Sequence, residues 1–417
     1  MLIDILILSV ATIVGLYMAS NIGANDLANA MGTSVGSGVL NIRQAVLISV
    51  VANTLGAVLA GGYVTSTISK GIIDPALLMD TPARLMLGMF AALISGGVWV
   101  NLATYLGLPV STTHAIIGAV VGFGMVSVGV GAISWDKIIT IAISWIVSPM
   151  VGAAVAGGMF YFVDKRIMRS KAPFKTSERY SPFMIFLVFL VLILSFVFKA
   201  LKNLHLNLSF LQTFLVTIPF AAVFGLLGRP WIRWQMEKGS FQSGGDKRSA
   251  VESVFAQLQV ITACYIAFAH GANDVANAIG PLAAIFSVVR TKAVLLQVHV
   301  PVWMLFAGGI AVGGGLMIFG TRVIETIGKN ITEITPARGF CVQFGAATTI
   351  LLCSRLGLPI STTHVLVGSV VGIGAMRGLG ALDLRILKNI GLSWIITLPF
   401  TVLLSMLLYK LLTLFLL

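Results

Sequence analysis

Long apolar runs separated by short polar segments make up most of this chain. Many of these runs approach the roughly 20 residues that an α-helix needs to cross the hydrocarbon core of a bilayer. The pattern therefore predicts an all-α polytopic membrane protein, with five runs, a two-helix linker and five further runs. The runs lie at 2–20, 44–63, 85–106, 115–133, 138–163, 183–198, 210–228, 254–269, 294–320, 340–353, 365–382 and 390–417.

Two basic segments flank the central pair of runs. Residues 164–180 carry six lysines and arginines, and residues 229–252 carry five. The two segments share one side of the membrane, which the positive-inside rule assigns to the cytoplasm. Five crossings on each flank then place both termini outside the cell membrane. The predicted domains are repeat 1 (1–163), basic loops around the two-helix linker (164–253) and repeat 2 (254–417).

The composition agrees with a membrane protein and excludes other classes. The chain is 58% hydrophobic and 10% charged, with a mean hydropathy of +1.00, whereas soluble domains carry about 25% charged residues. The net charge of +13 is explained by basic cytoplasmic loops. Because no soluble domain presents a basic face, a nucleic-acid partner is not expected.

Four motifs of the first half recur in the second half in the same order. The two longest matches have eight of ten and twelve of eighteen identical positions. Two related blocks with an odd number of crossings are inverted repeats, a common construction in transporters with broken helices or re-entrant hairpins. The runs at 115–133 and 365–382 fit either a span or such a hairpin. The matching pairs are Gly23–Gly32 with Gly271–Gly280, Thr81–Arg84 with Thr335–Arg338, Gly107–Gly124 with Gly357–Gly374, and Ser144–Ile146 with Ser393–Ile395.

The first repeated motif places the pattern Asn-Asp-x-x-Asn beside apolar runs. A charge at the centre of a membrane helix costs about 2.5–3.5 kcal/mol on insertion scales, so it is usually paired or functional. Carboxylate and amide oxygens are hard ligands, which suit Na⁺. The alternative is a polar cluster that only holds helices together. The candidate sodium ligands are Asp26, Asn29, Asp274 and Asn277.

The second repeated motif, Pro-x-Ser-Thr-Thr-His, predicts the start of a helix. Proline ends the preceding element, and serine caps the next one. The free backbone N–H groups and three hydroxyls would form a site for a tetrahedral oxyanion, without a lysine or arginine that opposes release. Helix capping alone is the alternative. The candidate anion ligands are Ser111, Thr112, Thr113, Ser361, Thr362 and Thr363.

Three further polar residues are candidates for coupling. His114 and His364 follow the hydroxyls directly, so each could carry a proton, bind the anion or orient a neighbour. Gln343 lies in an apolar run and offers a polar contact. His270 has Ile22 as its counterpart in the first repeat, so the repeat does not support a role for it.

The two duplicated motifs, Gly-Ala-Asn-Asp-x-Ala-Asn-Ala and Pro-x-Ser-Thr-Thr-His, resemble those of the inorganic phosphate transporter (PiT) family, solute carrier family 20. The resemblance spans about residues 10 to 400 and implies import of inorganic phosphate with Na⁺ or H⁺ by a homodimer, with no other cofactor. It implies phosphate contacts for the hydroxyls and for Asn25 and Asn273. The chain lacks the long central insert of animal members, which favours a prokaryotic, inner-membrane protein.

The predicted function is a secondary active symporter that imports inorganic phosphate by alternating access, with Na⁺ favoured over H⁺. Moving one charge against 100 mV costs about 2.3 kcal/mol, so a phosphate dianion needs roughly two compensating cations. A transporter of sulfate or another oxyanion, an anion channel and a membrane hydrolase are the alternatives. A hydrolase would use Ser111 and His114, but the motif holds no acid, so the chain is not expected to be an enzyme.

Overall fold

The computed structural model describes residues 2–61, 72–73, 75–203, 210–242, 246–295, 298, 300–355 and 360–416. Across these residues the regular structure is helical, apart from one isolated bridge between Ile73 and Ile133. The all-α prediction is therefore confirmed. Residues 62–63, 296–297 and 299 of the predicted runs, and residues 357–359 of the second hairpin motif, lie outside the described ranges.

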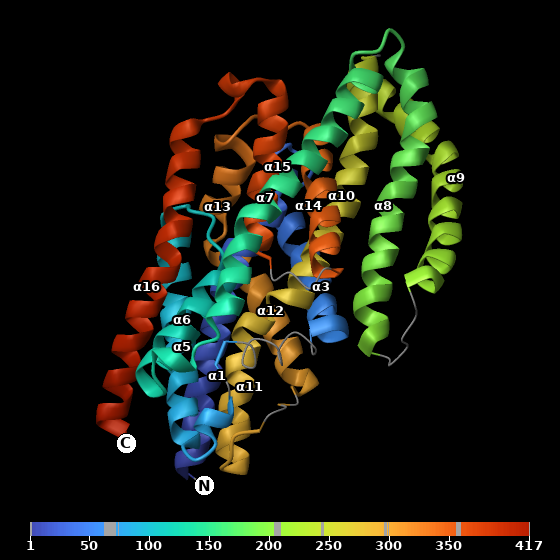
Figure 1. Ribbon diagram of the computed structural model, residues 1–417. Helices are drawn as coiled ribbons and strands as arrows, with labels where there is room; N and C mark the ends of the chain where they lie inside the picture. The colour runs from blue at the N-terminus through green and yellow to red at the C-terminus, as the bar shows by residue number, and fades with distance from the viewer. Residues whose placement is uncertain are drawn as a thin grey trace.

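The helices fall into three groups along the chain (Figure 1). The first group is α1 (Leu2–Ile22), η1 (Gly23–Leu27), α2 (Ala28–Gly36), α3 (Ile42–Ala60), η3 (Pro75–Leu78), α5 (Pro82–Tyr105), α6 (Thr112–Ser127), η4 (Val130–Ala132), α7 (Trp135–Val163) and η5 (Asp164–Met168). The linker holds α8 (Pro173–Asn203) and α9 (Phe210–Gln242). The last group is α10 (Lys247–Asn273), α11 (Ala276–Thr291), α12 (Val302–Phe319), α13 (Thr321–Glu325), η6 (Thr326–Asn330), α14 (Pro336–Arg355), α15 (Thr362–Arg377), η7 (Leu379–Ala381) and α16 (Leu384–Leu416).

Helices of one half of the chain pack against helices of the other half, in two sets of equivalent pairs. Helix α1 packs on α12, and its counterpart α10 packs on α3. Helix α6 packs on α16, and its counterpart α15 packs on α7. Each half therefore completes the helix layers of the other half. The inversion of one repeat relative to the other stays a prediction.

Both chain termini lie at the same end of the helix bundle (Figure 1). The start of α8, the end of α9 and the start of α10, which hold much of the two basic segments, lie at the opposite end. This arrangement agrees with a topology in which the termini share one side of a membrane. The assignment of that side to the cell exterior stays a prediction.

Nine helical segments of the described residues are long and apolar enough to cross a membrane. Helices α6 and α15 have 16 residues each, which corresponds to about 24 Å of helix, less than the roughly 30 Å hydrocarbon core. Each follows a longer helix in the chain, α5 or α14. The lengths favour the hairpin over the full span for these two runs.

The repeated Asn-Asp motif lies within a membrane pass and not beside one. The apolar runs at 2–20 and 254–269 predict helices that end before the motif, but helical segments continue through it as Leu2–Gly36 and Arg248–Thr291. In the first copy the turn widens into the π-helix η1, and in the second the helix breaks at Asp274 and Val275. The prediction was wrong because polar residues lower hydropathy without ending a helix.

The first glycine of each motif allows two helices to cross at very short distance. A Cβ atom on Gly23 would lie 1.6 Å from the carbonyl oxygen of Val312, and one on Gly271 would lie 1.9 Å from that of Asn53. Helix packing in membranes relies on such small residues. These crossings hold both copies of the motif in the centre of the bundle.

Candidate ion and anion site

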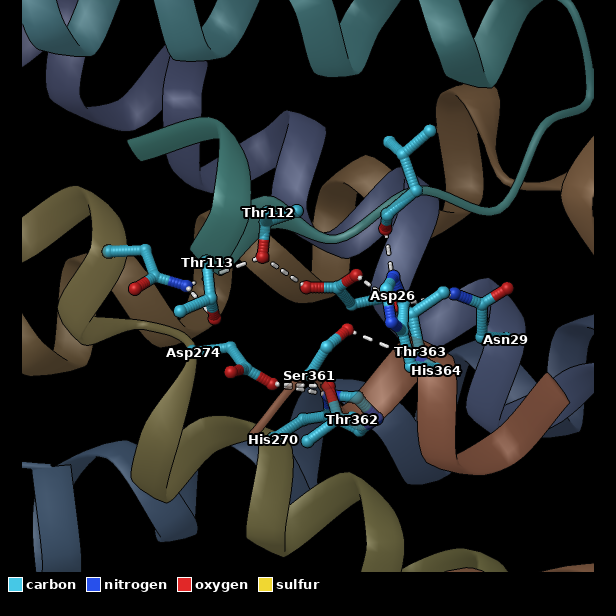
Figure 2. A network of polar contacts seen from close by, with 12 residues as sticks. Asp26, Asn29, Thr112, Thr113, His270, Asp274, Ser361, Thr362, Thr363 and His364 are labelled. Atoms are coloured by element: carbon cyan, nitrogen blue, oxygen red, sulfur yellow. Dashed lines mark hydrogen bonds and ion pairs between the residues drawn. The ribbon is translucent and has the colours of Figure 1, made fainter. Parts of the chain in front are cut away.

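The carboxylates of Asp26 and Asp274 converge in the interior of the bundle (Figure 2). The two residues are 1% and 4% exposed. One ligand atom from each of them and one from His270 all lie within 4.8 Å of one another. Asp26 comes from η1 and Asp274 from the break between α10 and α11, so both halves of the chain form this site.

The two hydroxyl motifs begin helices beside these carboxylates. Ser111 and Ser361 are N-cap residues with extended backbones, and their hydroxyls accept from the backbone N–H of His114 and His364 at 3.2 Å each. Helices α6 and α15 therefore start at the threonines, as the sequence predicted. Their free N–H groups and positive dipole ends lie next to the two acids.

A hydrogen-bond network joins the two motifs in a two-fold pattern. Within each half, a threonine donates to the aspartate. Across the halves, an asparagine amide donates to a threonine. The bonds are Thr112 to Asp26 (2.5 Å), Thr362 to Asp274 (3.2 Å), Asn29 to Thr363 (3.0 Å) and Asn277 to Thr113 (3.2 Å). The structure thus brings together all four predicted sodium ligands and the four predicted threonines.

The surroundings of the two carboxylates differ. Asp26 accepts a second hydroxyl bond, from Thr363 at 3.0 Å. Asp274 instead contacts His270, with 2.6 Å between its Oδ2 atom and the Nδ1 atom of the imidazole. Sequence comparison set His270 aside because the first repeat has Ile22 at that position. The sequence did contain a signal for this contact. His270 and Asp274 are four positions apart, a spacing that places two side chains on the same face of a helix.

Asn25 lies in the motif but serves the hairpin turn. Its amide donates to the Thr104 hydroxyl and to the Leu108 carbonyl at 3.0 Å each, and its carbonyl accepts from the N–H of Val110 at 3.0 Å. This set of bonds fixes the segment that leads to Ser111. Asn273 is half-buried at the last position of α10. Phosphate contacts for both asparagines stay predictions.

The motif histidines form a ring cluster with the tryptophans of the repeated Ser-Trp-Ile motif. His114 lies 3.5 Å from Trp145 and His364 lies 3.7 Å from Trp394, measured between ring centroids. The two histidine rings are 4.5 Å apart, edge to face. The cluster therefore links α6, α7, α15 and α16 across the two halves. A coupling role for the histidines stays a prediction.

The two tryptophans differ in their hydrogen bonding. Trp394 donates its Nε1–H to the carbonyl of Pro109 at 2.9 Å. The Nε1 atom of Trp145 is buried and has no hydrogen-bond partner in the part of the chain that is described. Among the described residues, the hydrogen bond of Trp394 therefore has no counterpart at Trp145.

Gln343 ties helices together beside the site. Its amide donates to the hydroxyls of Thr33 and Ser34 and to the Ala30 carbonyl, and its carbonyl accepts from Thr262 at 2.7 Å. These bonds connect α14 to α2 and to α10. The bond to α2 includes Ala30, which directly follows Asn29. The geometry shows a packing contact, and the coupling role proposed for Gln343 stays a prediction.

The site offers oxygen ligands and little positive charge. Among the described residues no lysine or arginine is buried, so His270 is the nearest group that can carry a positive charge. Two carboxylates this close in a low-dielectric interior repel each other strongly unless a cation or a proton intervenes. The Oδ1 atom of Asn29 is buried and has no hydrogen-bond partner among the described residues. The arrangement can therefore hold a hard cation next to an anion at the two helix starts.

Residues 22–405 match the model of the phosphate transporter family. A solved structure described as the sodium-dependent phosphate transporter aligns with a TM-score of 0.88 and 42% identity, covering 98% of this chain and 99% of that one. A provisionally named phosphate permease of Pyrococcus furiosus is 45% identical over 94% of this chain and 93% of its own length.

The Arabidopsis thaliana protein called inorganic phosphate transporter 2-1, chloroplastic, is 40% identical over 94% of this chain and 70% of its own length. These relatives are permeases and transporters and not enzymes, which removes the hydrolase alternative. The chain belongs to the phosphate transporter family.

Proposed function

We propose that this protein is a symporter that imports inorganic phosphate together with Na⁺. Membership of the phosphate transporter family and the similarity to a sodium-dependent phosphate transporter support both the anion and the cation. The observation that carries the sodium assignment is the close approach of the buried Asp26 and Asp274 carboxylates, with no lysine or arginine buried in the described part of the chain.

The cation ligands in this proposal are the oxygens of the Asn-Asp motifs. The carboxylates of Asp26 and Asp274 supply the charge, and the carbonyl oxygens of Asn29 and Asn277 supply further oxygen ligands. The unpartnered Oδ1 atom of Asn29 supports this role, because a buried carbonyl oxygen is normally bonded. Two carboxylates are consistent with the roughly two cations that a phosphate dianion requires against a membrane potential.

Phosphate lies between the starts of α6 and α15 in this proposal. The ligands there are backbone N–H groups and the hydroxyls of Ser111–Thr113 and Ser361–Thr363, which bind a tetrahedral oxyanion through hydrogen bonds and helix dipoles. Because no lysine or arginine is buried among the described residues, the anion is held without a fixed full charge. A transporter must also release its ligand, and this environment permits release.

Threonine hydroxyls couple the two ligands. In the structure Thr112 and Thr363 donate to Asp26, and Thr362 donates to Asp274. A sodium ion on the carboxylates occupies the same oxygen lone pairs, so the hydroxyl hydrogens become free to donate to phosphate. Cation binding thereby prepares the anion site, which is the condition for coupled transport.

Alternating access in this proposal comes from movement of one hairpin relative to the other. The tryptophan bonds support it, since Trp394 anchors the α6 hairpin through Pro109, whereas Trp145 has no hydrogen-bond partner among the described residues. In the opposite-facing state the two tryptophans exchange roles. The Pro359 carbonyl, the counterpart of Pro109, lies outside the described residues.

Uptake of radiolabelled phosphate into proteoliposomes, with Na⁺ and pH gradients imposed separately, tests the proposal. An inward Na⁺ gradient is expected to drive accumulation above equilibrium, and a pH gradient alone is not. Excess sulfate is expected to compete weakly. Accumulation driven by the pH gradient alone would overturn the sodium assignment, and equilibration without any gradient dependence would indicate a channel.

The proposed location is the inner cell membrane, with both termini outside and two copies forming a homodimer. A cysteine introduced at the exposed Leu2 should react with an impermeant maleimide in intact cells. A cysteine at Lys175, in the basic segment, should react only after permeabilisation. The reverse labelling pattern would invert the topology, and light scattering of the purified protein reports the number of copies.

A further inference from the structure

The two linker helices leave a groove between them toward the basic end of the bundle. Arg229 on α9 lies 3.9 Å from Glu178 near the start of α8, and further along Phe224 stacks on Phe189 with 4.0 Å between ring centroids. This register shows that the helices run antiparallel (Figure 1). Between the two contacts they enclose an outward-open hollow of about 710 Å³.

The groove has two chemically different ends. Three cations and one carboxylate line one end, namely Lys175, Arg179, Arg229 and Glu178. The remainder is lined by apolar side chains such as Phe183, Phe186 and Leu226. The cationic end therefore carries net positive charge, and the apolar end offers a surface for hydrocarbon.

Small residues keep the floor of the groove open. Ala222 and Gly225 face it from α9. A Cβ atom on Gly225 would lie 3.1 Å from the Cβ atom of Phe186 and 3.1 Å from the Pro182 carbonyl oxygen. The two helices are therefore in close contact at Gly225, and a larger side chain there would press α8 and α9 apart and change the shape of the hollow.

The direction of the groove matches the depth profile of a bilayer. Both helices belong to candidate membrane spans, Pro173–Phe198 and Leu211–Lys238. Lys175 and Phe186 are eleven positions apart on α8, a rise of about 16 Å, comparable with half of the roughly 30 Å hydrocarbon core. Leu226 and Leu227 on the outer face are 76% and 64% exposed. The cationic end therefore lies at headgroup level when the apolar end lies among acyl chains.

We propose that this groove binds an anionic phospholipid. The headgroup phosphate lies among Lys175, Arg179 and Arg229, and one acyl chain follows Phe183, Phe186 and Leu226 over Gly225. Guanidinium groups match phosphate oxygens through paired N–H donors, and basic pockets between membrane helices are known to hold such headgroups. This groove lies on the linker helices, away from the carboxylates of Asp26 and Asp274. Lipid binding there is independent of the transported ions.

Lipid binding to the purified, delipidated full-length protein tests this proposal, with native mass spectrometry as the readout. Phosphatidylglycerol is expected to form a stable one-to-one adduct, and phosphatidylcholine of the same chain length is expected to bind at least tenfold more weakly. A basic residue near the headgroups contributes roughly fivefold to affinity. The double variant R179Q/R229Q should therefore bind phosphatidylglycerol about thirty-fold more weakly.

Matched variants separate charge from shape. Arg233→Gln removes an exposed cation one turn beyond Arg229 that pairs with Glu237 outside the groove, and it should leave lipid binding unchanged. Gly225→Leu keeps every charge and should abolish the adduct, because the leucine would press against α8 and change the shape of the groove. If Gly225→Leu fails to fold, R179Q/R229Q, which alters exposed residues only, still decides the outcome.

Three results would overturn the proposal. Equal binding of both lipids would remove the charge argument. Displacement of the adduct by millimolar inorganic phosphate or glycerol phosphate would identify a site for free phosphate. Conversion of a dimer to a monomer by Gly225→Leu, with lipid adducts unchanged, would show that the groove contacts a second copy of the chain.

Discussion

The side-chain amide of Asn29 donates a hydrogen bond of 3.0 Å to the hydroxyl of Thr363, 334 positions further along the chain. Asn277 makes the reciprocal bond to Thr113, at 3.2 Å. The second asparagine of each Asn-Asp-x-x-Asn motif therefore contacts a threonine hydroxyl of the other repeat. If the hairpin that begins at Ser111 moves relative to the one that begins at Ser361, these two bonds must change. The positions of the proposed ion ligands Asn29 and Asn277 therefore depend on the positions of the hairpins.

Replacement of Asp26 or Asp274 by asparagine is expected to reduce sodium-driven phosphate uptake to the level of empty liposomes. The substitution keeps the shape of the side chain but removes the charge that neutralises the cation. Size-exclusion chromatography and circular dichroism should show a retained fold. Asp136→Asn, at an exposed position in the first turn of α7, is the control and should transport normally. Unchanged uptake in both single variants would refute the assignment.

Thr363→Val should weaken sodium-dependent uptake more than Thr363→Ser. The Thr363 hydroxyl donates within reach of both Asp26 (3.0 Å) and the Val110 carbonyl (3.2 Å), and accepts from Asn29. A hydrogen bond to a charged group contributes about 1.5–3 kcal/mol, so the valine variant, which lacks the hydroxyl that would donate to phosphate, should lose about tenfold or more in apparent phosphate affinity. The serine variant keeps the hydroxyl and should stay close to wild type. Equal effects of the two substitutions would assign the loss to packing.

Trp394→Phe is expected to lower the melting temperature in detergent, and Trp145→Phe is not. The first substitution breaks the bond to the Pro109 carbonyl and leaves that oxygen without its donor, a loss of about 1 kcal/mol or more. The second removes an N–H group that has no hydrogen-bond partner within the described ranges. If the tryptophans exchange roles during transport, both variants should turn over more slowly. Equal melting temperatures would show that the bond does not stabilise this conformation.

Gly23→Ala should prevent recovery of folded protein, because the added Cβ atom would lie 1.6 Å from the Val312 carbonyl oxygen. Backbone atoms cannot move aside as a flexible side chain can, so α1 and α12 must separate. Gly158→Ala, on α7 with open space around its Cβ position, is the matched control and should be purified at wild-type yield. Monodisperse Gly23→Ala protein at normal yield would show that the crossing is less tight than the structure indicates.

Glu333→Gln should lower the melting temperature at pH 7, with a difference that disappears in acid. Hydrogen bonding to Arg338 and the charges of Arg338 and Arg377 lower the pKa of Glu333 from its ordinary value of 4.5. A carboxylate with a lowered pKa stabilises the folded state fully above the unfolded-state value and loses this contribution as the pH falls through the folded-state value. A gap that persists at pH 3 would contradict this explanation.

Hydropathy alone located most of the helices, because burial in a bilayer is a property of each local segment. The run at 138–163 predicts α7 (Trp135–Val163) within three residues at its start. Helices α2 (Ala28–Gly36) and α11 (Ala276–Thr291) are exceptions, since no apolar run predicted them. Each follows a copy of the Asn-Asp motif, whose polar residues interrupt the hydropathy signal.

Local chemistry also determined part of the site from the sequence. Ser111 caps α6 because its hydroxyl accepts from an N–H three residues later, a bond within one turn of chain. Duplication of the motifs singled out Asp26 and Asp274, since a repeated acid in an apolar segment requires a function.

Only the tertiary structure decided which of these groups meet. The contact between His270 and Asp274, next to Asp26, breaks the symmetry of the repeat and so was hidden from a comparison of its copies. The bond from Asn29 to Thr363 depends on how the two halves pack, because neither residue determines the position of the other through the chain. Motifs therefore identified the chemical groups, and the packing of one repeat against the other set their partners.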